Sequence, residues 1–221
     1  MKDFLHVNDL NEDNLNDILD RSSWIKKKVK GKNDYKPLEG KSMAMIFAKP
    51  SARTRISFET GFYNLGGHAL YLGPNDIGIG KRESVSDIGR VISRFNDIIM
   101  ARLFQHNHML ELAEFSTVPV INGLTDFNHP CQIVADLFTI KEHLDRSQDF
   151  TISYVGDGNN IVHSWLELAM IIPFKLNIVC PEGYCPDLDL VKKAQKKGLS
   201  DIQIIHDPKE GVKNSDIIYS E

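Results

Sequence analysis

Short apolar runs alternate with helical patterns along the whole chain. Apolar runs of strand length occupy residues 43–48, 69–72, 97–101, 118–122, 152–155, 176–180, 202–205 and 216–219. Between these runs, apolar residues recur at intervals of three and four, which is typical of helices with one buried face. The helices predicted on this basis cover residues 51–65, 84–95, 130–144, 160–172 and 187–197. This alternation predicts an α/β fold in which parallel sheets are covered by helices on both faces.

A polar segment at residues 142–150 separates two stretches of this alternation. We therefore predict two doubly wound parallel-sheet domains, at residues 1–146 and 147–221, because a chain of this length can bury two modest cores. The second stretch stops at residues 216–221, with a strand and no closing helix behind it. We therefore expect the second domain to be truncated in this chain and the chain to be a portion of a longer polypeptide.

The composition is that of an ordinary globular protein, with 42% hydrophobic and 25% charged residues. The formal net charge of −4 argues against a nucleic-acid binder of the basic-patch kind. A basic run at residues 26–32 is interpreted as a solvated helix end. No apolar run approaches the ~20 residues of a membrane span, and none at the N-terminus resembles a signal peptide. We expect no membrane partner and a cytoplasmic location.

The three cysteines, Cys131, Cys180 and Cys185, form no recognisable disulfide framework and show no zinc-ligand spacing with the nearby histidines. Cys131 also lacks the neighbours of a nucleophile, so we expect a packed thiol at that position. The sequence therefore predicts a protein of a reducing compartment, with no metal and no cofactor.

The segment Ser51-Ala-Arg-Thr-Arg55 directly follows the first predicted strand and has the features of a phosphate site. Ser51 lies where a helix N-cap belongs, and the free N–H groups and the dipole of the first turn favour an anion there. Arg53 adds a planar cation that suits phosphate oxygens, and the hydroxyls of Ser51 and Thr54 add donors. An ordinary capped helix with solvated arginines is the alternative interpretation of this segment alone.

Further polar residues follow other predicted strands. Arg102 ends the run at 97–101, where a buried guanidinium requires an anion or a carbonyl group, although an exposed arginine is the alternative. His129 precedes a helix that begins at Pro130, whose positive end keeps the imidazole neutral and able to donate to a carbonyl oxygen. Gln132 follows one turn later. A lone histidine before a helix is more often a cap. The interpretation of His129 as a substrate-binding residue therefore depends on several polar segments that all follow predicted strands, because ligands bind at the carboxyl ends of parallel strands.

The segment Gly156-Asp-Gly-Asn-Asn160 matches only the first part of a dinucleotide-binding fingerprint. Ile161 occupies the position of the third glycine, and no ribose-binding acid stands about 20 residues later. We therefore favour a role for the amides of Asn159 and Asn160 in binding a small polar substrate. A dinucleotide- or phosphate-binding regulatory module remains the alternative from a different functional class.

Together, the segment Ser51–Arg55, the segment His129-Pro-Cys-Gln132 and the segment Gly156–Asn160 resemble the aspartate/ornithine carbamoyltransferase family, and specifically its anabolic ornithine-specific members. The resemblance runs across essentially the whole chain with the motifs in order. Cys131 and the pair Asn160-Ile161 distinguish the chain from aspartate-specific members, which typically carry His-Pro-Thr-Gln and Gly-Arg at these places.

The resemblance implies transfer of the carbamoyl group of carbamoyl phosphate to the δ-amine of L-ornithine, giving L-citrulline and phosphate in arginine biosynthesis. It implies that carbamoyl phosphate contacts Ser51, Ala52, Arg53, Thr54, Arg102, His129 and Gln132. Thr54, Arg102 and His129 would be the catalytic residues among these, and Asn159 and Asn160 would bind ornithine. A carbamoyltransferase for another amine, such as putrescine, would share the same motifs.

Members of this family are trimers in which a loop of the neighbouring subunit reaches the phosphate. The resemblance places that loop at residues 75–83, with Gly78 where many relatives have a glutamine or histidine side chain. Lys81 is the candidate for the contact in its place, with solvated Lys81 and Arg82 as the alternative. Two family segments that complete the ornithine site would lie beyond Glu221, so we expect an incomplete amino-acid pocket.

Overall fold

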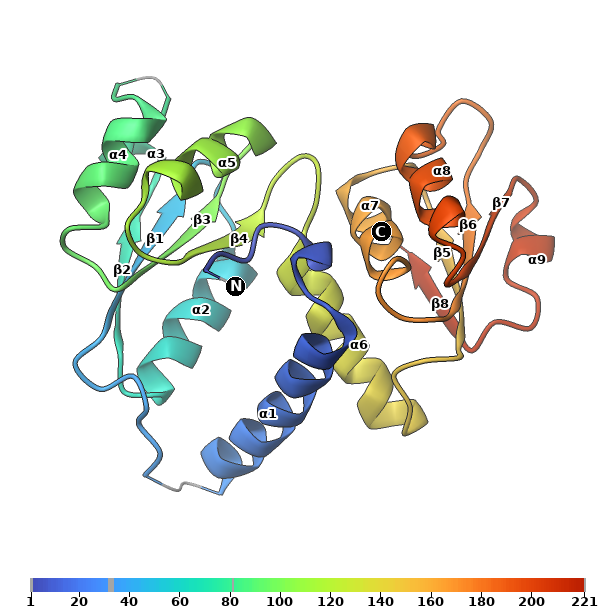
Figure 1. The fold of residues 1–221 in the computed structure, drawn as a ribbon, viewed down its shortest axis with the longest axis horizontal. Helices are drawn as coiled ribbons and strands as arrows, with labels where there is room; N and C mark the ends of the chain where they lie inside the picture. Colours follow the sequence, from blue (N-terminus) through green and yellow to red (C-terminus); the bar gives the residue numbers. More distant parts are fainter. Residues whose placement is uncertain (1, 32–33, 81, 221) are drawn as a thin grey trace. The chain divides into compact units, whose positions relative to one another are not determined.

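The computed structural model describes residues 2–31, 34–80 and 82–220. Within these residues, eight strands form two four-stranded sheets, and every strand pair is parallel (Figure 1). Contacts divide the chain into two compact units, one made of Met1–Leu5 and Asn16–Asp126 and the other of His6–Leu15 and Phe127–Glu221. The predicted α/β class with two parallel sheets is confirmed. None of the described helices combines the length and the apolar character needed to cross a membrane.

The sheet of the first unit has the strand order β2-β1-β3-β4. Its strands are β1 (Ser42–Phe47), β2 (His68–Leu72), β3 (Ile98–Arg102) and β4 (Val120–Leu124). The helices that accompany them are α1 (Glu12–Lys30), α2 (Ala52–Asn64), α3 (Pro74–Ile77), α4 (Val85–Ile92) and α5 (His106–Phe115). A helix follows each of the first three strands, as the parallel connections require.

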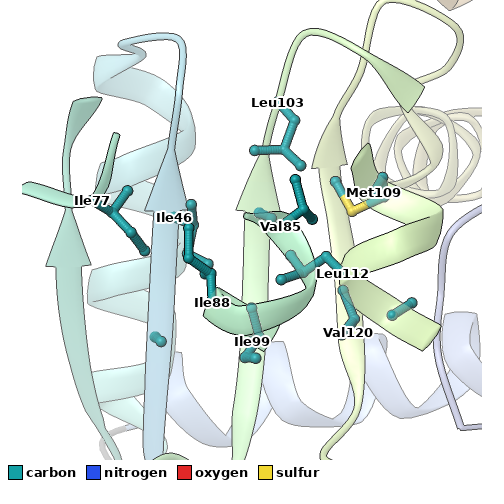
Figure 2. Close-up of a cluster of buried hydrophobic side chains, with 12 residues drawn as sticks. Ile46, Ile77, Val85, Ile88, Ile99, Leu103, Met109, Leu112 and Val120 are labelled. Carbon is teal, nitrogen blue, oxygen red and sulfur yellow. The ribbon is translucent and has the colours of Figure 1, made fainter. Parts of the chain in front are cut away.

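Alternate residues of β1 are buried on opposite faces of this sheet, as the two-residue period of a strand dictates. Ala44 and Ile46 belong to a cluster that α3, α4 and α5 cover; Figure 2 shows side chains such as Val85 and Leu112 within it. The other face buries Met43, Met45, Phe47, Met100 and, from α2, Phe62. Burial on both faces explains why β1 reads as a continuous apolar run rather than an alternating one.

The sheet of the second unit has the strand order β7-β6-β5-β8. Its strands are β5 (Thr151–Val155), β6 (Lys175–Val179), β7 (Asp201–Ile205) and β8 (Ile217–Ser220). The helical segments of this unit are η1 (Val7–Asp9), α6 (Pro130–Leu144), α7 (Asn160–Leu168), α8 (Leu188–Lys197) and α9 (Pro208–Gly211). Trp165 and Tyr154 are fully buried in its core, where Trp165 packs edge-on against Phe174.

Several predicted boundaries differ from the structure for local reasons. The strand predicted at 118–122 is observed two residues later, as β4 (Val120–Leu124). Residues 118 and 119 extend the apolar run but belong to the connection that precedes the strand. The helix predicted at 160–172 ends at Leu168. The apolar pattern that predicted it continues through Ala169, Ile171 and Ile172, which are buried but lie beyond the helix. Helices α1 and α5 and the four-residue helices α3 and α9 were not among the predicted helices. The basic run at residues 26–32 was interpreted as a helix end, and α1 does end within it, at Lys30.

The two compact units do not test the domain boundary predicted between residues 146 and 147, which stays a prediction, but they do group α6 with the second sheet. Helix α6 packs against α7 and η1, so it belongs to the second unit. The segment His6–Leu15 joins the same unit although it lies far away in sequence. Apolar periodicity reports which face of a segment is buried, and it does not report which sheet that face meets.

Replacement of Leu112, which is fully buried in the Figure 2 cluster, should reveal how tightly the first unit is packed. Leu112→Ala should lower the free energy of unfolding by about 2–5 kcal/mol, because it removes buried methyl groups and leaves a cavity. Leu110→Ala on the same helix is the matched control, since Leu110 is 41% exposed, and should cost less than about 1 kcal/mol. Urea denaturation measures both; equal losses would contradict the packing described here.

Candidate active site

The turn between β1 and α2 forms the first part of the candidate site. Ser51 is the N-cap of α2 in an extended conformation, and its Oγ accepts a hydrogen bond from the Thr54 backbone N–H at 3.4 Å. The Ser51 hydroxyl also donates to Thr54 Oγ1 at 3.1 Å. The predicted N-cap is therefore confirmed. Ala52 and Arg53 follow in the first turn of α2, where the free N–H groups and the dipole of a helix favour an anion.

Strand pairing brings Arg102 to the same turn. The register places Arg102 beside Phe47, the last residue of β1, and the Ala48 N–H donates to the Arg102 carbonyl oxygen at 2.9 Å. Arg102 Nη1 lies 3.4 Å from Thr54 Oγ1 and donates to it. The structure therefore brings together two residues that are 48 positions apart in the sequence and that were both predicted to contact one ligand.

The arginines at this turn differ in how their charges are balanced. Arg55 is occupied, because its Nε donates to Glu59 at 2.9 Å and its guanidinium lies 4.0 Å from the centre of the Tyr71 ring. Within the described part of the chain, neither Arg53 nor Arg102 has a carboxylate partner, and Arg102 Nε is buried without an acceptor. Burial, and then the nearby charge of Arg53, lower the pKa of Arg102. An anion bound here would relieve both effects.

The position of this cationic turn follows from the order of the strands. The chain moves from β1 to β2 on one side and later places β3 on the other side of β1. The connections that leave β1 and β3 therefore diverge, and such a switch point is where open α/β sheets bind ligands. A register shift between Ala101 and Arg102 in the β3–β4 pair changes the direction of the chain at the same edge.

The loop predicted to contact a neighbouring subunit follows α3. Gly78 ends this helix in the left-handed region, with φ of 55°, where a side chain would be strained. Gly78 also lines a cavity of about 240 Å³ together with Ala48, Phe104 and His108. Lys81, the predicted contact residue, lies outside the described residues.

In the second unit, His129 is the N-cap of α6, so the helix begins at Pro130 as predicted. The backbone N–H of His129 donates to Ser164 Oγ at 2.8 Å, and the Ser164 hydroxyl donates to the carbonyl oxygen of Asn160 at 2.9 Å. Ser164 therefore links two segments that were both predicted to bind substrate. The sequence analysis did not select Ser164, because a serine in an apolar helix has no distinctive pattern.

Gln132 lies one turn into α6, and its Nε2 donates to Asp136 Oδ1 at 2.9 Å. Asp136 is half-buried, and desolvation raises the pKa of its carboxyl group, although the bond from Gln132 acts in the opposite direction. This contact holds the amide of Gln132 in one orientation. On the same helix, burial raises the pKa of the Cys131 thiol to about 12, which agrees with the predicted packed thiol and not with a nucleophile.

The loop between β5 and α7 carries the two asparagines, at the switch point between β5 and β8 of the second sheet. Asn159 is the N-cap of α7, and its Oδ1 accepts from the N–H groups of Ile161 at 2.9 Å and Val162 at 3.4 Å. Its oxygen is thus occupied in capping. Gly158 is required by a close approach, since a Cβ there would lie 2.2 Å from the backbone nitrogen of Pro186.

Helix α7 also carries a buried carboxylate, Glu167, that the sequence did not predict. Glu167 on α7 is only 2% exposed, and it accepts hydrogen bonds from the Val7 N–H at 2.9 Å and from Asn128 Nδ2 at 3.3 Å. His6 Nδ1 lies 2.6 Å from its other oxygen. Burial alone would lower the pKa of His6, but the hydrogen bond and charge of Glu167 outweigh it and raise the pKa. This network fixes Asn128, the residue before His129.

Comparison with known proteins identifies the same family that the sequence motifs resemble, and the matches cover nearly the whole chain. The family model described as aspartate/ornithine carbamoyltransferase, carbamoyl-P binding domain, matches residues 2–142, and the model of the Asp/Orn binding domain matches residues 148–221. The chloroplastic ornithine carbamoyltransferase of Pisum sativum is 56% identical over the full chain, and that of Chlorobaculum tepidum is 45% identical. The chain spans 59% and 66% of the lengths of these two relatives.

Solved structures agree in fold. The ornithine carbamoyltransferase from Pyrococcus furiosus is 41% identical with a TM-score of 0.94, and the match covers 99% of this chain and 71% of that chain. The enzyme from Burkholderia thailandensis is 40% identical, also with a TM-score of 0.94, over 100% of this chain and 75% of that chain. The matches to both family models, together with the motifs that the structure places at the ends of the parallel strands, lead to one conclusion. The chain belongs to the aspartate/ornithine carbamoyltransferase family.

Proposed function

We propose that the protein transfers the carbamoyl group of carbamoyl phosphate to the δ-amine of L-ornithine, releasing L-citrulline and phosphate. The proposal rests on one observation. Arg53 and Arg102 lie near each other at the N-terminus of α2, and neither has a carboxylate partner among the described residues. Two cations and a helix end at one turn suit the dianionic phosphate of this substrate. Membership of the family, and the names of its most similar relatives, support the choice of reaction.

In the proposed reaction, the nitrogen of the amine attacks the carbamoyl carbon, and the bond from that carbon to the phosphate oxygen breaks. The attacking amine must be neutral, although a free alkyl amine with a pKa near 10.4 is mostly protonated at neutral pH, so ornithine loses one proton to solvent before attack. A second proton leaves the nitrogen as the new C–N bond forms, and the departing phosphate accepts it. Arg102, Thr54 and His129 stabilise the negative charge that develops on the carbamoyl oxygen. Arg53 and the N-terminus of α2 stabilise the departing phosphate, with Ser51 and the backbone of Ala52 as further donors.

The acceptor amine is assigned to ornithine because relatives 41–56% identical over nearly the whole chain carry the name ornithine carbamoyltransferase. Asn160 is the proposed contact, with Asn159 holding the loop and Gln132 assisting at the carbamoyl end. The test is citrulline formation by the full-length protein, with putrescine and aspartate offered as competing acceptors. Carbamoylation of putrescine in preference to ornithine would overturn the assignment of the acceptor.

A homotrimer, a role in arginine biosynthesis and a cytoplasmic location complete the proposal. Ile56 and Tyr63 on α2 are 62% and 75% exposed, which leaves apolar surface that a second subunit could cover. The three cysteines are free thiols, as is usual in reducing compartments. The relative from Pisum sativum, in contrast, is a chloroplastic protein.

Arg53→Ala should weaken the binding of carbamoyl phosphate and of inorganic phosphate together, because both would share the anion site at the start of α2. The loss of a hydrogen bond to a charged group, about 1.5–3 kcal/mol, corresponds to roughly 10–100-fold in affinity. Arg55→Ala is the matched control, because Arg55 is held by Glu59 and Tyr71, and it should leave both affinities unchanged. Calorimetry that finds equal effects for the two variants would remove Arg53 from this role.

His129→Asn should lower kcat by about 10²–10³, the usual effect of removing one donor to a developing oxyanion. Its effect on phosphate affinity should be less than about threefold, since its proposed contact is with the carbonyl group. His143→Asn, at the exposed end of the same helix, provides the control and should retain full turnover. Normal turnover combined with poor phosphate affinity in His129→Asn would reverse the assignment.

A further inference from the structure

Two cysteines and a histidine meet at the carboxyl edge of the second sheet. Cys180 directly follows β6, Cys185 lies in the loop before α8, and His206 directly follows β7. Strands β6 and β7 are neighbours, with Val179 paired to Ile205, so the residues after them are also adjacent. One ligand atom from each of the three side chains lies within 4.8 Å of the other two.

The two sulfurs have the spacing of metal ligands. Their Sγ atoms are 3.5 Å apart and both cysteines are free, whereas the sulfurs of a disulfide are about 2.05 Å apart. In a tetrahedral zinc site with Zn–S bonds of about 2.3 Å, two thiolate sulfurs are about 3.8 Å apart. Little movement would therefore be needed for both sulfurs to coordinate one ion.

A hydrogen bond to the backbone determines which ring nitrogen of His206 keeps a lone pair. Its Nδ1 lies 2.8 Å from the backbone carbonyl oxygen of Cys180. A carbonyl can only accept, so Nδ1 carries the hydrogen and Nε2 keeps its lone pair. Histidines that bind metals commonly donate the other ring N–H to a backbone carbonyl or carboxylate in this way. His206 is exposed while Cys180 is buried, so the cluster is open to solvent on the side of the histidine.

We propose that Cys180, Cys185 and His206 form a site for a thiophilic divalent cation, Zn²⁺, with water from solvent as the fourth ligand. Thiolate and imidazole ligands in a tetrahedral arrangement select zinc over the hard cations Mg²⁺ and Ca²⁺. Spacing in the sequence did not predict this site, because a helix and a strand separate Cys185 from His206. The evidence for this site does not rest on the proposed carbamoyl transfer.

The metal site would stabilise the loop that supports the two asparagines. Within the Cys180–Cys185 loop, the carbonyl oxygen of Tyr184 accepts from the Gly158 N–H at 2.7 Å. Just beyond it, the Asp187 N–H lies 3.3 Å from Nε2 of His163 on α7. Coordination by both cysteines would fix this loop and, through Gly158, the turn that carries Asn159 and Asn160. Because the ion would bind the folded form of this loop, its occupancy should raise the stability of the second unit.

The test uses the full 221-residue chain, treated with a chelator and kept under a phosphine reductant that maintains the thiols. Addition of Zn²⁺ should give one-to-one binding in a competition assay with a chromogenic chelator, and it should raise Tm. Co²⁺ should give the thiolate charge-transfer and d–d absorption of a tetrahedral site. The proposal would be overturned if the reduced protein failed to bind Zn²⁺. That result would hold even if Cys180 and Cys185 formed a disulfide once the reductant was removed, because a redox-active pair is not a metal site.

Variants of the more accessible ligands separate this site from adventitious binding. Cys185→Ser and His206→Asn should each weaken Zn²⁺ binding at least about 10-fold, and Cys185→Ser should reduce the thiolate absorption of the cobalt form. Cys131→Ser is the matched control, because Cys131 lies on α6 outside the cluster, and it should bind Zn²⁺ like the unchanged protein. Retention of full affinity by His206→Asn, or an equal loss in Cys131→Ser, would also overturn the site.

Discussion

Parallel strands that share a register must end at the same edge of their sheet, and this constraint determines where the chemistry of the protein lies. In the first unit, the pairing of Phe47 with Arg102 brings a guanidinium to the turn that Ser51 caps. In the second unit, the pairing of Val179 with Ile205 brings the residues after β6 and β7 together. Each polar group is supplied by a different loop, so its position depends on the apolar packing that aligns the strands.

The turn at the start of α2 places Arg53 and Arg102 near each other without a balancing carboxylate among the described residues. Burial and the charge of Arg53 both disfavour the cation of Arg102, and Arg102 Nε is buried without an acceptor in the described structure. Arg55, in contrast, is balanced by Glu59 and by the face of Tyr71. Local rules of stability are most often broken at functional sites, where a ligand supplies what the fold lacks. The difference between neighbouring arginines is thus the physical observation that supports the proposed anion site.

The second unit uses buried polar contacts for a different purpose. Glu167 is almost completely buried, and a carboxylate in such a place is tolerated only with good partners, here His6, Asn128 and the Val7 N–H. The same helix supplies Ser164, which bonds the backbone of His129. These contacts order the start of α6 and attach the segment 6–15 to α6 and α7, which come much later in the chain. The predicted substrate-binding residues are therefore held by side chains that have no catalytic signature.

The sequence alone determined the α/β class, the N-cap at Ser51 and the helix start at Pro130, because periodicity and capping depend on residues close together in the chain. The motifs also indicated the family. Only the tertiary structure decided that Arg102 reaches Thr54, that Asn159 uses its oxygen as a cap, and that α6 belongs to the second unit. It also decided that His206 joins Cys180 and Cys185. Contacts between distant segments depend on strand order and register, and these are set by the packing of the whole sheet rather than by any local pattern.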